Sequence, residues 1–155
     1  HITTAKWVLS WKTDAKDAIT KAKARLVARG FGQRFAVDYF ETFASTPAMP
    51  SIKLVMAVAV QRGWPMYPFH VTRAFVRAKV DTNVLMKLPD GCGPQTGSTV
   101  TLEKFIYGVK QAGRQRSILL NQTLMEDAGM SQSKTDPCVY KQEKRGMCHV
   151  CIVVI

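Results

Sequence analysis

A chain of 155 residues fits one compact domain, and its 46% hydrophobic and 21% charged content excludes a disordered polypeptide. Twenty-two lysines and arginines against 11 acidic residues leave a formal net charge of +11. Such a charge attracts polyanions, either nucleic acid or an anionic membrane surface, and does not choose between them.

The first half of the chain is predicted to begin with a long, basic β-hairpin. Its strands run from Ala5 to Trp11 and from about Lys21 to Arg29. Asp38 to Pro50 has the aromatic and turn-forming residues of a loop. A helix capped by Ser51 and ended by Gly63 is predicted next. Its apolar positions lie on one helical face: Ile52, Val55, Met56 and Ala59.

The middle of the chain is predicted to continue with short elements. Met66 to Val71 and Val84 to Leu88 have the composition of strands, and Ala74 to Arg77 that of a tight turn between them. Pro89-Asp90-Gly91 ends the second strand, and a flexible connection from Gly93 to Ser98 follows.

The last third is predicted to contain one helix and one hairpin. The helix runs from Arg114 to Ala128 and stops at Gly129. Val139 to Gln142 and Cys148 to Ile155 then pair over a tight turn at Lys144-Arg145-Gly146. The order of elements predicts a mixed α/β (α+β) fold with mostly antiparallel sheets and packed helices.

The cysteines and the two ends of the chain bear on metal binding, on the cellular compartment and on whether the chain is a fragment. Cys148, His149 and Cys151 resemble half a zinc site, but no second ligand pair with knuckle spacing exists, so no metal site is predicted. With no recognisable signal peptide and no apolar stretch of about 18 residues, we expect an intracellular protein, cytoplasmic or nuclear. Because the chain starts at His1 and ends inside an apolar run, we expect a fragment of a longer protein.

Several segments, read in order, resemble the reverse transcriptase domain of copia-type retrotransposons. They are Lys6-Trp7-Val8, Lys23-Ala24-Arg25-Leu26-Val27-Ala28-Arg29-Gly30-Phe31, Asp38-Tyr39-Phe40-Glu41-Thr42-Phe43, Gly63-Trp64, Val71-Thr72-Arg73-Ala74-Phe75, Tyr107-Gly108-Val109-Lys110-Gln111-Ala112 and Ser133-Lys134-Thr135-Asp136-Pro137-Cys138-Val139-Tyr140. Together these segments cover nearly the whole chain.

The resemblance implies the fingers and the first part of the palm of a right-hand polymerase. Residues of about 1–65 and 100–145 would be fingers-like, and about 66–99 and 146–155 palm-like. An RNA or DNA template-primer and a deoxynucleoside triphosphate would be the partners, with no membrane partner. Mg²⁺ ions held by carboxylates would be the cofactor.

The resemblance also implies nucleotide-binding residues. Lys23, Arg25 and Arg29 would grip the triphosphate, although a solvated basic face explains these residues equally well. Phe75 would exclude a ribose 2′-hydroxyl, or is an ordinary core residue. The segment that lines the nucleotide pocket and template strand would be Tyr107, Gly108, Lys110 and Gln111. Asp136-Pro137 is interpreted as a turn.

Departures from the family pattern concentrate at the metal site. His70 occupies the position of the first catalytic aspartate, and imidazole is a poor ligand for Mg²⁺. The chain ends at Ile155, before the Tyr-x-Asp-Asp hairpin that would supply the other carboxylates. No catalytic residue is therefore intact, and we predict that this chain does not polymerise DNA. Gly113 and Arg116 replace the usual proline and aromatic residue.

Three interpretations follow. The chain is part of an RNA-directed DNA polymerase whose missing portion a longer product supplies, or a non-catalytic basic module that binds nucleic acid. Alternatively, it is a relic of a transposon polyprotein with no function. A nucleophilic hydrolase built on a cysteine and His1, His70 or His149 has no support from residue spacing.

Overall fold

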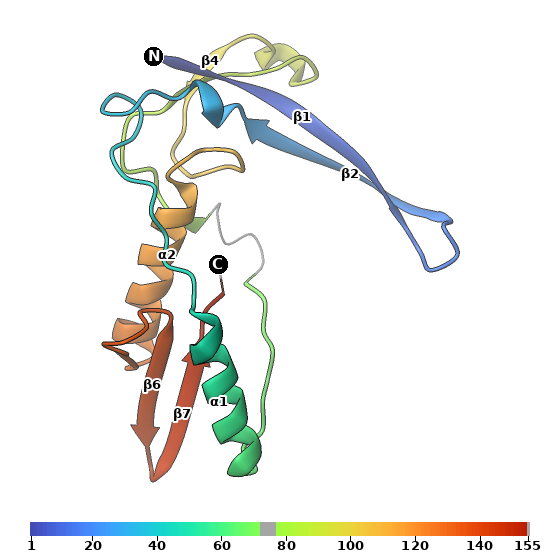
Figure 1. Ribbon diagram of the computed structural model, residues 1–155. Coiled ribbons are helices and arrows are strands. Elements are labelled where there is room, and N and C mark those ends of the chain that lie inside the picture. Colours follow the sequence, from blue (N-terminus) through green and yellow to red (C-terminus); the bar gives the residue numbers. More distant parts are fainter. Residues whose placement is uncertain (72–76, 155) are drawn as a thin grey trace. The chain divides into compact units, whose positions relative to one another are not determined.

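A long antiparallel hairpin forms the first part of the chain, coloured blue in Figure 1. It pairs β1 (Ile2–Thr13) with β2 (Ile19–Ala28), and the register shifts between Lys12 and Thr13. Asp14 closes its loop, because the carboxylate oxygen Oδ1 accepts hydrogen bonds from the backbone N–H groups of Lys16 and Ala18. The structure confirms the predicted hairpin.

The computed structural model describes residues 1–71 and 77–154. The chain divides into two units, His1–Thr42 with Arg73–Gln115 and Phe43–Thr72 with Arg116–Ile155. We refer to them as the first and second units. The predicted turn at Ala74 to Arg77 lies, except for Arg77, outside the described residues.

The first unit contains a four-stranded sheet in the order β2-β1-β3-β4. β3 (Leu85–Lys87) lies parallel to Ile2–Thr4 of β1 and antiparallel to β4 (Thr99–Thr101). A 3-10 turn, η3 (Gly93–Gln95), lies in the connection between β3 and β4 that was predicted to be flexible. The core of this unit comprises Ala5, Ala28, Ala78, Val84, Met86, Phe105, Val109 and Ala112. Burial of a large side chain such as Phe105 stabilises the unit by about 1.5–3 kcal/mol.

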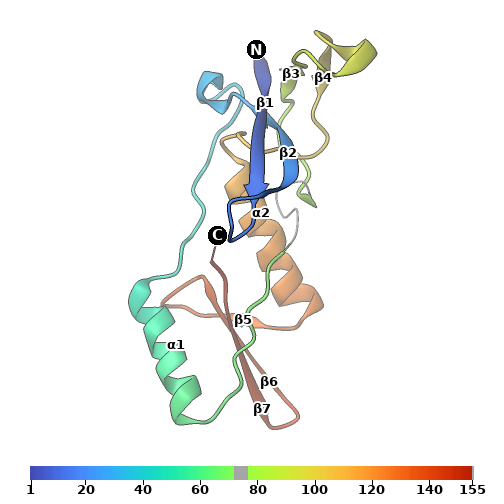
Figure 2. The ribbon, with the colours of Figure 1, turned by 90° about the vertical axis from the view of Figure 1, so that its right-hand side faces the viewer.

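The second unit contains α1 (Met49–Gln61) and a three-stranded antiparallel sheet in the order β5-β6-β7. β5 (Ser131–Gln132) pairs with β6 (Val139–Lys144), which pairs in turn with β7 (Met147–Ile152). Figure 2 shows β6 and β7 as a ribbon with a tight turn at its end. Arg145 and Gly146 in that turn have φ values of 52° and 74°, as a two-residue hairpin turn requires. This hairpin was predicted from the sequence.

The second predicted helix is also present. α2 (Ala112–Gln122) begins two residues before the predicted start and continues into a π-helical turn, η4 (Thr123–Asp127). Gly129 follows with a φ of 65°, the left-handed conformation that favours glycine at a helix end. Helices and mostly antiparallel sheets confirm the mixed α/β class.

Two local predictions are wrong. Met66 to Val71 forms no strand, because Pro65 and Pro68 have no N–H to donate to a sheet. Ser51 is not the helix cap, since α1 begins at Met49 with Pro50 in its first turn and Ala48 at the cap. Gly63, with a φ of 64°, does end α1 as predicted.

Candidate functional site

The register of the β1–β2 hairpin separates its side chains by chemistry. Ser10 lies opposite Lys23, Val8 opposite Arg25 and Lys12 opposite Lys21. Because side chains of paired residues project from the same face of a sheet and alternate along each strand, these four cations share one face with Lys6, which lies opposite Val27. We call this the basic face, defined by Lys12, Lys21, Lys23 and Arg25. The opposite face is apolar and contains Trp7, Leu9, Trp11, Ala22, Ala24 and Leu26.

Repulsion among these cations perturbs Lys23. The charge of Arg25, partial burial and the charges of Lys12 and Lys21 lower the pKa of Lys23 from its usual 10.5. The folded protein therefore disfavours the ammonium form of Lys23, and a bound anion would relieve the repulsion. The basic face is thus suited to binding a polyanion.

The segment Tyr107–Gly108 lies against the end of β2. The backbone N–H of Ala28 donates to the carbonyl oxygen of Tyr107 at 2.8 Å, and the guanidinium of Arg25 lies 5.8 Å from the Tyr107 ring centroid. A Cβ at Gly108 would lie 2.1 Å from the Ala28 carbonyl oxygen, and one at Gly30 would lie 1.9 Å from that of Gly108. Only glycine permits this contact between backbones.

A buried polar cluster continues from this segment. The side-chain amide of Gln111 donates to the Asp38 carbonyl oxygen at 2.9 Å and to the Thr82 hydroxyl at 3.2 Å. It accepts from Gln33 Nε2 at 3.2 Å, and Gln33 Oε1 accepts from the backbone N–H of Lys110 at 2.8 Å. We call Gln33, Asp38, Thr82, Lys110 and Gln111 the Gln33–Gln111 cluster. Because Gln111 is fully buried and its amide is satisfied, the cluster fixes the position of the segment.

Lys110 and Asp38 extend the cluster toward the surface. Lys110 Nζ donates to the Gln33 carbonyl oxygen at 3.1 Å and lies 4.8 Å from the centroid of the Tyr39 ring. Asp38 Oδ2 accepts from the backbone N–H of Arg34 at 2.7 Å and lies 2.8 Å from His1 Nδ1. Gln33 had no sequence signal, because its partner Gln111 is far away in the chain.

The structure brings some predicted nucleotide-binding residues together. Lys23 and Arg25 lie on the same face of β2, and Arg25 lies against the Tyr107 ring. Arg29 follows β2 with an exposed side chain. The contact of Lys110 and Gln111 with a nucleotide stays a prediction, since both side chains bond to protein oxygens. Phe75 lies outside the described residues.

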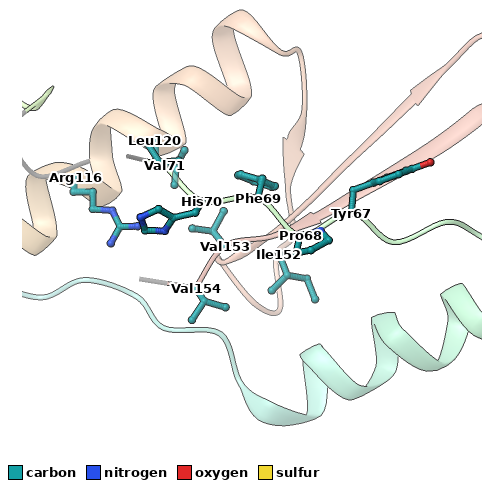
Figure 3. Close-up of a pocket in the computed structure, with 10 residues that line it drawn as sticks. All are labelled: Tyr67, Pro68, Phe69, His70, Val71, Arg116, Leu120, Ile152, Val153 and Val154. Carbon is teal, nitrogen blue, oxygen red and sulfur yellow. The ribbon is translucent and has the colours of Figure 1, made fainter. Parts of the chain in front are cut away.

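His70 lies in a pocket of the second unit, shown in Figure 3. The cavity measures about 210 Å³, and three segments form it: residues 67–71, α2 and the end of β7 with the residues after it. Its lining residues are Tyr67, Pro68, Phe69, His70, Val71, Arg116, Leu120, Ile152, Val153 and Val154. Figure 3 shows the imidazole of His70 directed toward the guanidinium of Arg116. We call this the His70–Arg116 pocket.

The residues of the pocket do not fit Mg²⁺. This ion requires an octahedron of hard oxygen ligands, supplied by carboxylates and water. None of the described lining residues is acidic, and Arg116 adds a positive charge. Within residues 1–71 and 77–154, no three His, Cys, Asp or Glu side chains form a group that could hold a metal ion.

A second polar site in this unit centres on Asp136. The buried carboxylate accepts hydrogen bonds from the backbone N–H of Cys138 at 2.9 Å and of Ala48 at 3.0 Å. Hydrogen bonds from the Ser51 side chain, Cys138 and Ala48 lower the pKa of Asp136 below its usual 3.8. Asp136 thus ties the first turn of α1 to the segment before β6.

Over the described part of the chain, no helix is long and apolar enough to cross a membrane.

Comparison with known proteins yields one matching family and several relatives. The family model described as "Reverse transcriptase (RNA-dependent DNA polymerase)" matches residues 1–154. The Pol polyproteins of transposons RE1 and RE2 of Arabidopsis thaliana are 33% identical over 144 residues and 34% identical over 137 residues. The corresponding polyprotein of transposon TNT 1-94 of Nicotiana tabacum is 30% identical over 137 residues.

These relatives are much longer than the chain. The alignments cover 90%, 87% and 87% of this chain but only 10%, 9% and 10% of the respective polyproteins. No solved structure matches the chain.

Proposed function

Because the chain belongs to the reverse transcriptase (RNA-dependent DNA polymerase) family, we propose that it provides the nucleotide-binding hairpin of a copia-type retrotransposon polymerase. We further propose that it does not support magnesium-dependent synthesis. In this proposal the hairpin and the Tyr107–Gly108 segment belong to the fingers, and the segment at His70 belongs to the palm.

The observation that supports the binding role is the basic face. Lys12, Lys21, Lys23 and Arg25 project from one side of β1 and β2, and their mutual repulsion lowers the pKa of Lys23. A triphosphate or a nucleic-acid backbone would neutralise this repulsion. Arginine binds phosphate oxygens in a bidentate manner and lysine acts as a point charge, so the two residue types complement each other at such a site.

The Gln33–Gln111 cluster would support this role by fixing the segment next to the hairpin. It holds Lys110 and Gln111 in place, and the contact between Gly30 and Gly108 positions Tyr107 against Arg25. Arg29 follows the hairpin and would reach the same ligand. In this proposal the segment from Tyr107 to Gln111 provides a preorganised surface for the ligand, and the hairpin provides the positive charge.

The chemistry at position 70 supports the second part of the proposal. In-line phosphoryl transfer by this class of enzyme uses divalent ions held by carboxylates. The His70–Arg116 pocket offers an imidazole and a guanidinium and no acidic side chain among its described residues. A downstream portion of a longer protein could add carboxylates, but it would not remove these two groups.

Nucleic-acid binding tests the first part. Lys23→Gln should weaken binding of an RNA–DNA template-primer and reduce the salt dependence of log K by about 0.7–0.9 per lost phosphate contact. Lys144→Gln is the charge-matched control, because Lys144 is the last residue of β6 in the second unit. Equal losses from both variants would show that overall charge, and not the basic face, causes binding.

Primer extension tests the second part. The parent chain should add no nucleotides on an RNA template with Mg²⁺ or Mn²⁺. Templated addition by the purified parent chain would refute the proposed loss of synthesis while leaving the binding role intact.

A second candidate function, a non-catalytic module that binds nucleic acid, is supported by the same basic face. It predicts binding that is steeply salt-dependent, indifferent to sequence and unchanged by a chelator of divalent ions. Tighter binding of an RNA–DNA template-primer when the matching deoxynucleoside triphosphate is added would favour the polymerase role over this module.

A further inference from the structure

Lys23 differs from the other lysines of the β1–β2 hairpin in its burial. Lys23 is half-buried, whereas the other four are exposed: Lys6, Lys12, Lys16 and Lys21. Ser10 lies opposite Lys23 in the register, and its short, uncharged side chain offers no ion pair across the strands. The hairpin therefore confines one amine among the cations of the basic face.

The charged residues of the two hairpin strands are all basic. Neither Ile2–Thr13 nor Ile19–Ala28 contains an aspartate or a glutamate. Arg25 lies on the same face as Lys23, and its guanidinium lies 5.8 Å from the Tyr107 ring centroid. The charge of Arg25 is the main cause of the lowered pKa of Lys23, and partial burial is the next. Compared with an ordinary lysine, Lys23 is therefore more often a free amine near neutral pH.

A free amine among phosphate-binding groups suits a particular class of substrate. The uncharged amine is the nucleophilic form of lysine, and lysines that are desolvated or beside another cation form imines with carbonyl compounds. The surrounding cations attract phosphates. The substrate should therefore carry a carbonyl group within a phosphate backbone. An abasic site in DNA fits this description, because loss of the base leaves a deoxyribose whose open-chain form is an aldehyde.

We propose that Lys23 forms an imine with the aldehyde of an abasic site in DNA and cleaves the strand at that site. The inference rests on the proposed binding of nucleic acid by the basic face and adds an activity to it. Phosphates bound by Arg25 and Lys21 would offset part of the repulsion at Lys23. Its partial burial would remain and continue to favour the free amine.

The reaction is an addition followed by an elimination, and it needs no oxidant. The free Nζ of Lys23 adds to C1′ of the open-chain sugar, and water leaves as a C=N bond forms that is protonated from solvent. The positive charge of this imine acidifies C2′, which loses a proton to solvent. The C3′–O bond then breaks, a C2′=C3′ double bond forms, and the oxygen departs with the 5′-phosphate of the downstream strand. Water hydrolyses the imine and releases the amine of Lys23.

The test is reductive trapping on a single-stranded DNA oligonucleotide with one abasic site. Cyanoborohydride reduces the imine to a stable amine, and mass spectrometry of peptides then identifies the lysine that carries the DNA. We expect the adduct at Lys23 and, without the reductant, a strand break that leaves a 5′-phosphate. An adduct spread evenly over the lysines of the chain would overturn the inference.

Two conservative variants separate the nucleophile from the charge. Lys23→Arg keeps the positive charge but removes the primary amine, so it should bind the oligonucleotide as the parent does and lose both the adduct and the strand break. Lys16→Arg, in the exposed loop between β1 and β2, is the matched control and should retain both. Undiminished adduct and cleavage by Lys23→Arg would refute the inference.

The pH dependence of trapping tests the activation of the amine. Arg25→Gln removes the largest of the charges that lower the pKa of Lys23, so adduct formation should move to higher pH. Lys53→Gln removes a charge from α1 in the second unit and should leave the pH profile unchanged. A profile that Arg25→Gln does not shift would contradict the inference.

A matched oligonucleotide with an intact base distinguishes two kinds of failure. Salt-dependent binding of the intact oligonucleotide, with no adduct at Lys23 on the abasic one, would refute this inference and leave the proposed function in place. Absence of binding to both oligonucleotides would refute the proposed binding role and this inference together.

Discussion

The Gln33–Gln111 cluster and the His70–Arg116 pocket both unite polar side chains from distant segments, but the first is buried and the second lines a cavity. In the cluster, Gln111 is fully buried and every polar atom of its amide bonds to protein. In the pocket, two nitrogen-rich side chains line an open cavity. Burial and complete hydrogen bonding make the cluster a contributor to stability. Disruption of the cluster should therefore lower the free energy of unfolding, whereas a change in the pocket should alter it little.

The two units differ in charge and in burial as well. The first has 15 basic against 7 acidic residues, and the second has 7 against 4. Large apolar side chains are exposed in both units, for example Trp11 and Phe31 in the first and Leu54 and Tyr67 in the second. The net positive charge thus resides mostly in the first unit, which also holds most of the buried apolar residues among those that the structure describes.

Breaking the backbone contact between Gly108 and Ala28 should have the largest effect on stability. Gly108→Ala forces a Cβ to within 2.1 Å of the Ala28 carbonyl oxygen at a φ of 90°. We expect a loss of about 3 kcal/mol in the free energy of unfolding, measured by urea denaturation. Gly32→Ala is the control, since a Cβ there meets nothing within 4 Å, and its effect should stay within about 0.5 kcal/mol. Similar effects of the two substitutions would contradict the described contact.

Removing the central amide of the cluster should have the next largest effect. Gln111→Leu leaves Gln33, the Thr82 hydroxyl and the Asp38 carbonyl oxygen without their partner. We expect a loss of about 2–3 kcal/mol, because unsatisfied buried groups retain their desolvation cost. Gln122→Leu at the exposed end of α2 is the matched control. A change below about 0.5 kcal/mol for Gln111→Leu would show that the cluster does not contribute to stability.

The Asp136 site should give a smaller effect that depends on pH. Hydrogen bonds lower the pKa of Asp136 in the folded protein. The carboxylate therefore makes its full contribution to the free energy of unfolding above the usual carboxyl pKa of 3.8. This contribution is lost as the pH falls through the lower folded value. Asp136→Asn should therefore lower the urea midpoint at pH 7, and the difference from the parent should shrink at pH 3. A difference that stays constant between these pH values would disprove the role of the carboxylate.

Changing the pocket should have the smallest effect on stability. His70→Asp alters an exposed side chain, so we expect less than about 0.5 kcal/mol in urea denaturation. It should not create a Mn²⁺ site on its own, because the new carboxylate faces Arg116 and would pair with it. The double variant His70→Asp/Arg116→Gln should bind Mn²⁺ more tightly than either single variant, measured by paramagnetic broadening. If His70→Asp alone binds Mn²⁺ as tightly as the double variant, Arg116 does not oppose the metal.

Sequence reasoning succeeded where local signals determine structure. Strand-like composition and turn signals identified both hairpins, and Gly63 and Gly129 correctly marked the ends of the two helical regions. It failed at Met66 to Val71, where strand-like composition outweighed the two prolines, and at Ser51, where Pro50 moved the helix start. The very short strands β4 and β5 had no sequence signal, because pairing with a neighbour defines them.

The amino-acid sequence alone determined the family and the basic charge, and it predicts that His70 stands in place of a catalytic carboxylate, because these inferences depend only on the order of residues. Only the tertiary structure brought Gln33 to Gln111 and His70 to Arg116, since packing and hydrogen bonding between distant segments create those contacts. Local periodicity encodes strands and helices. The character of a cavity, however, depends on which side chains meet there after the chain has folded.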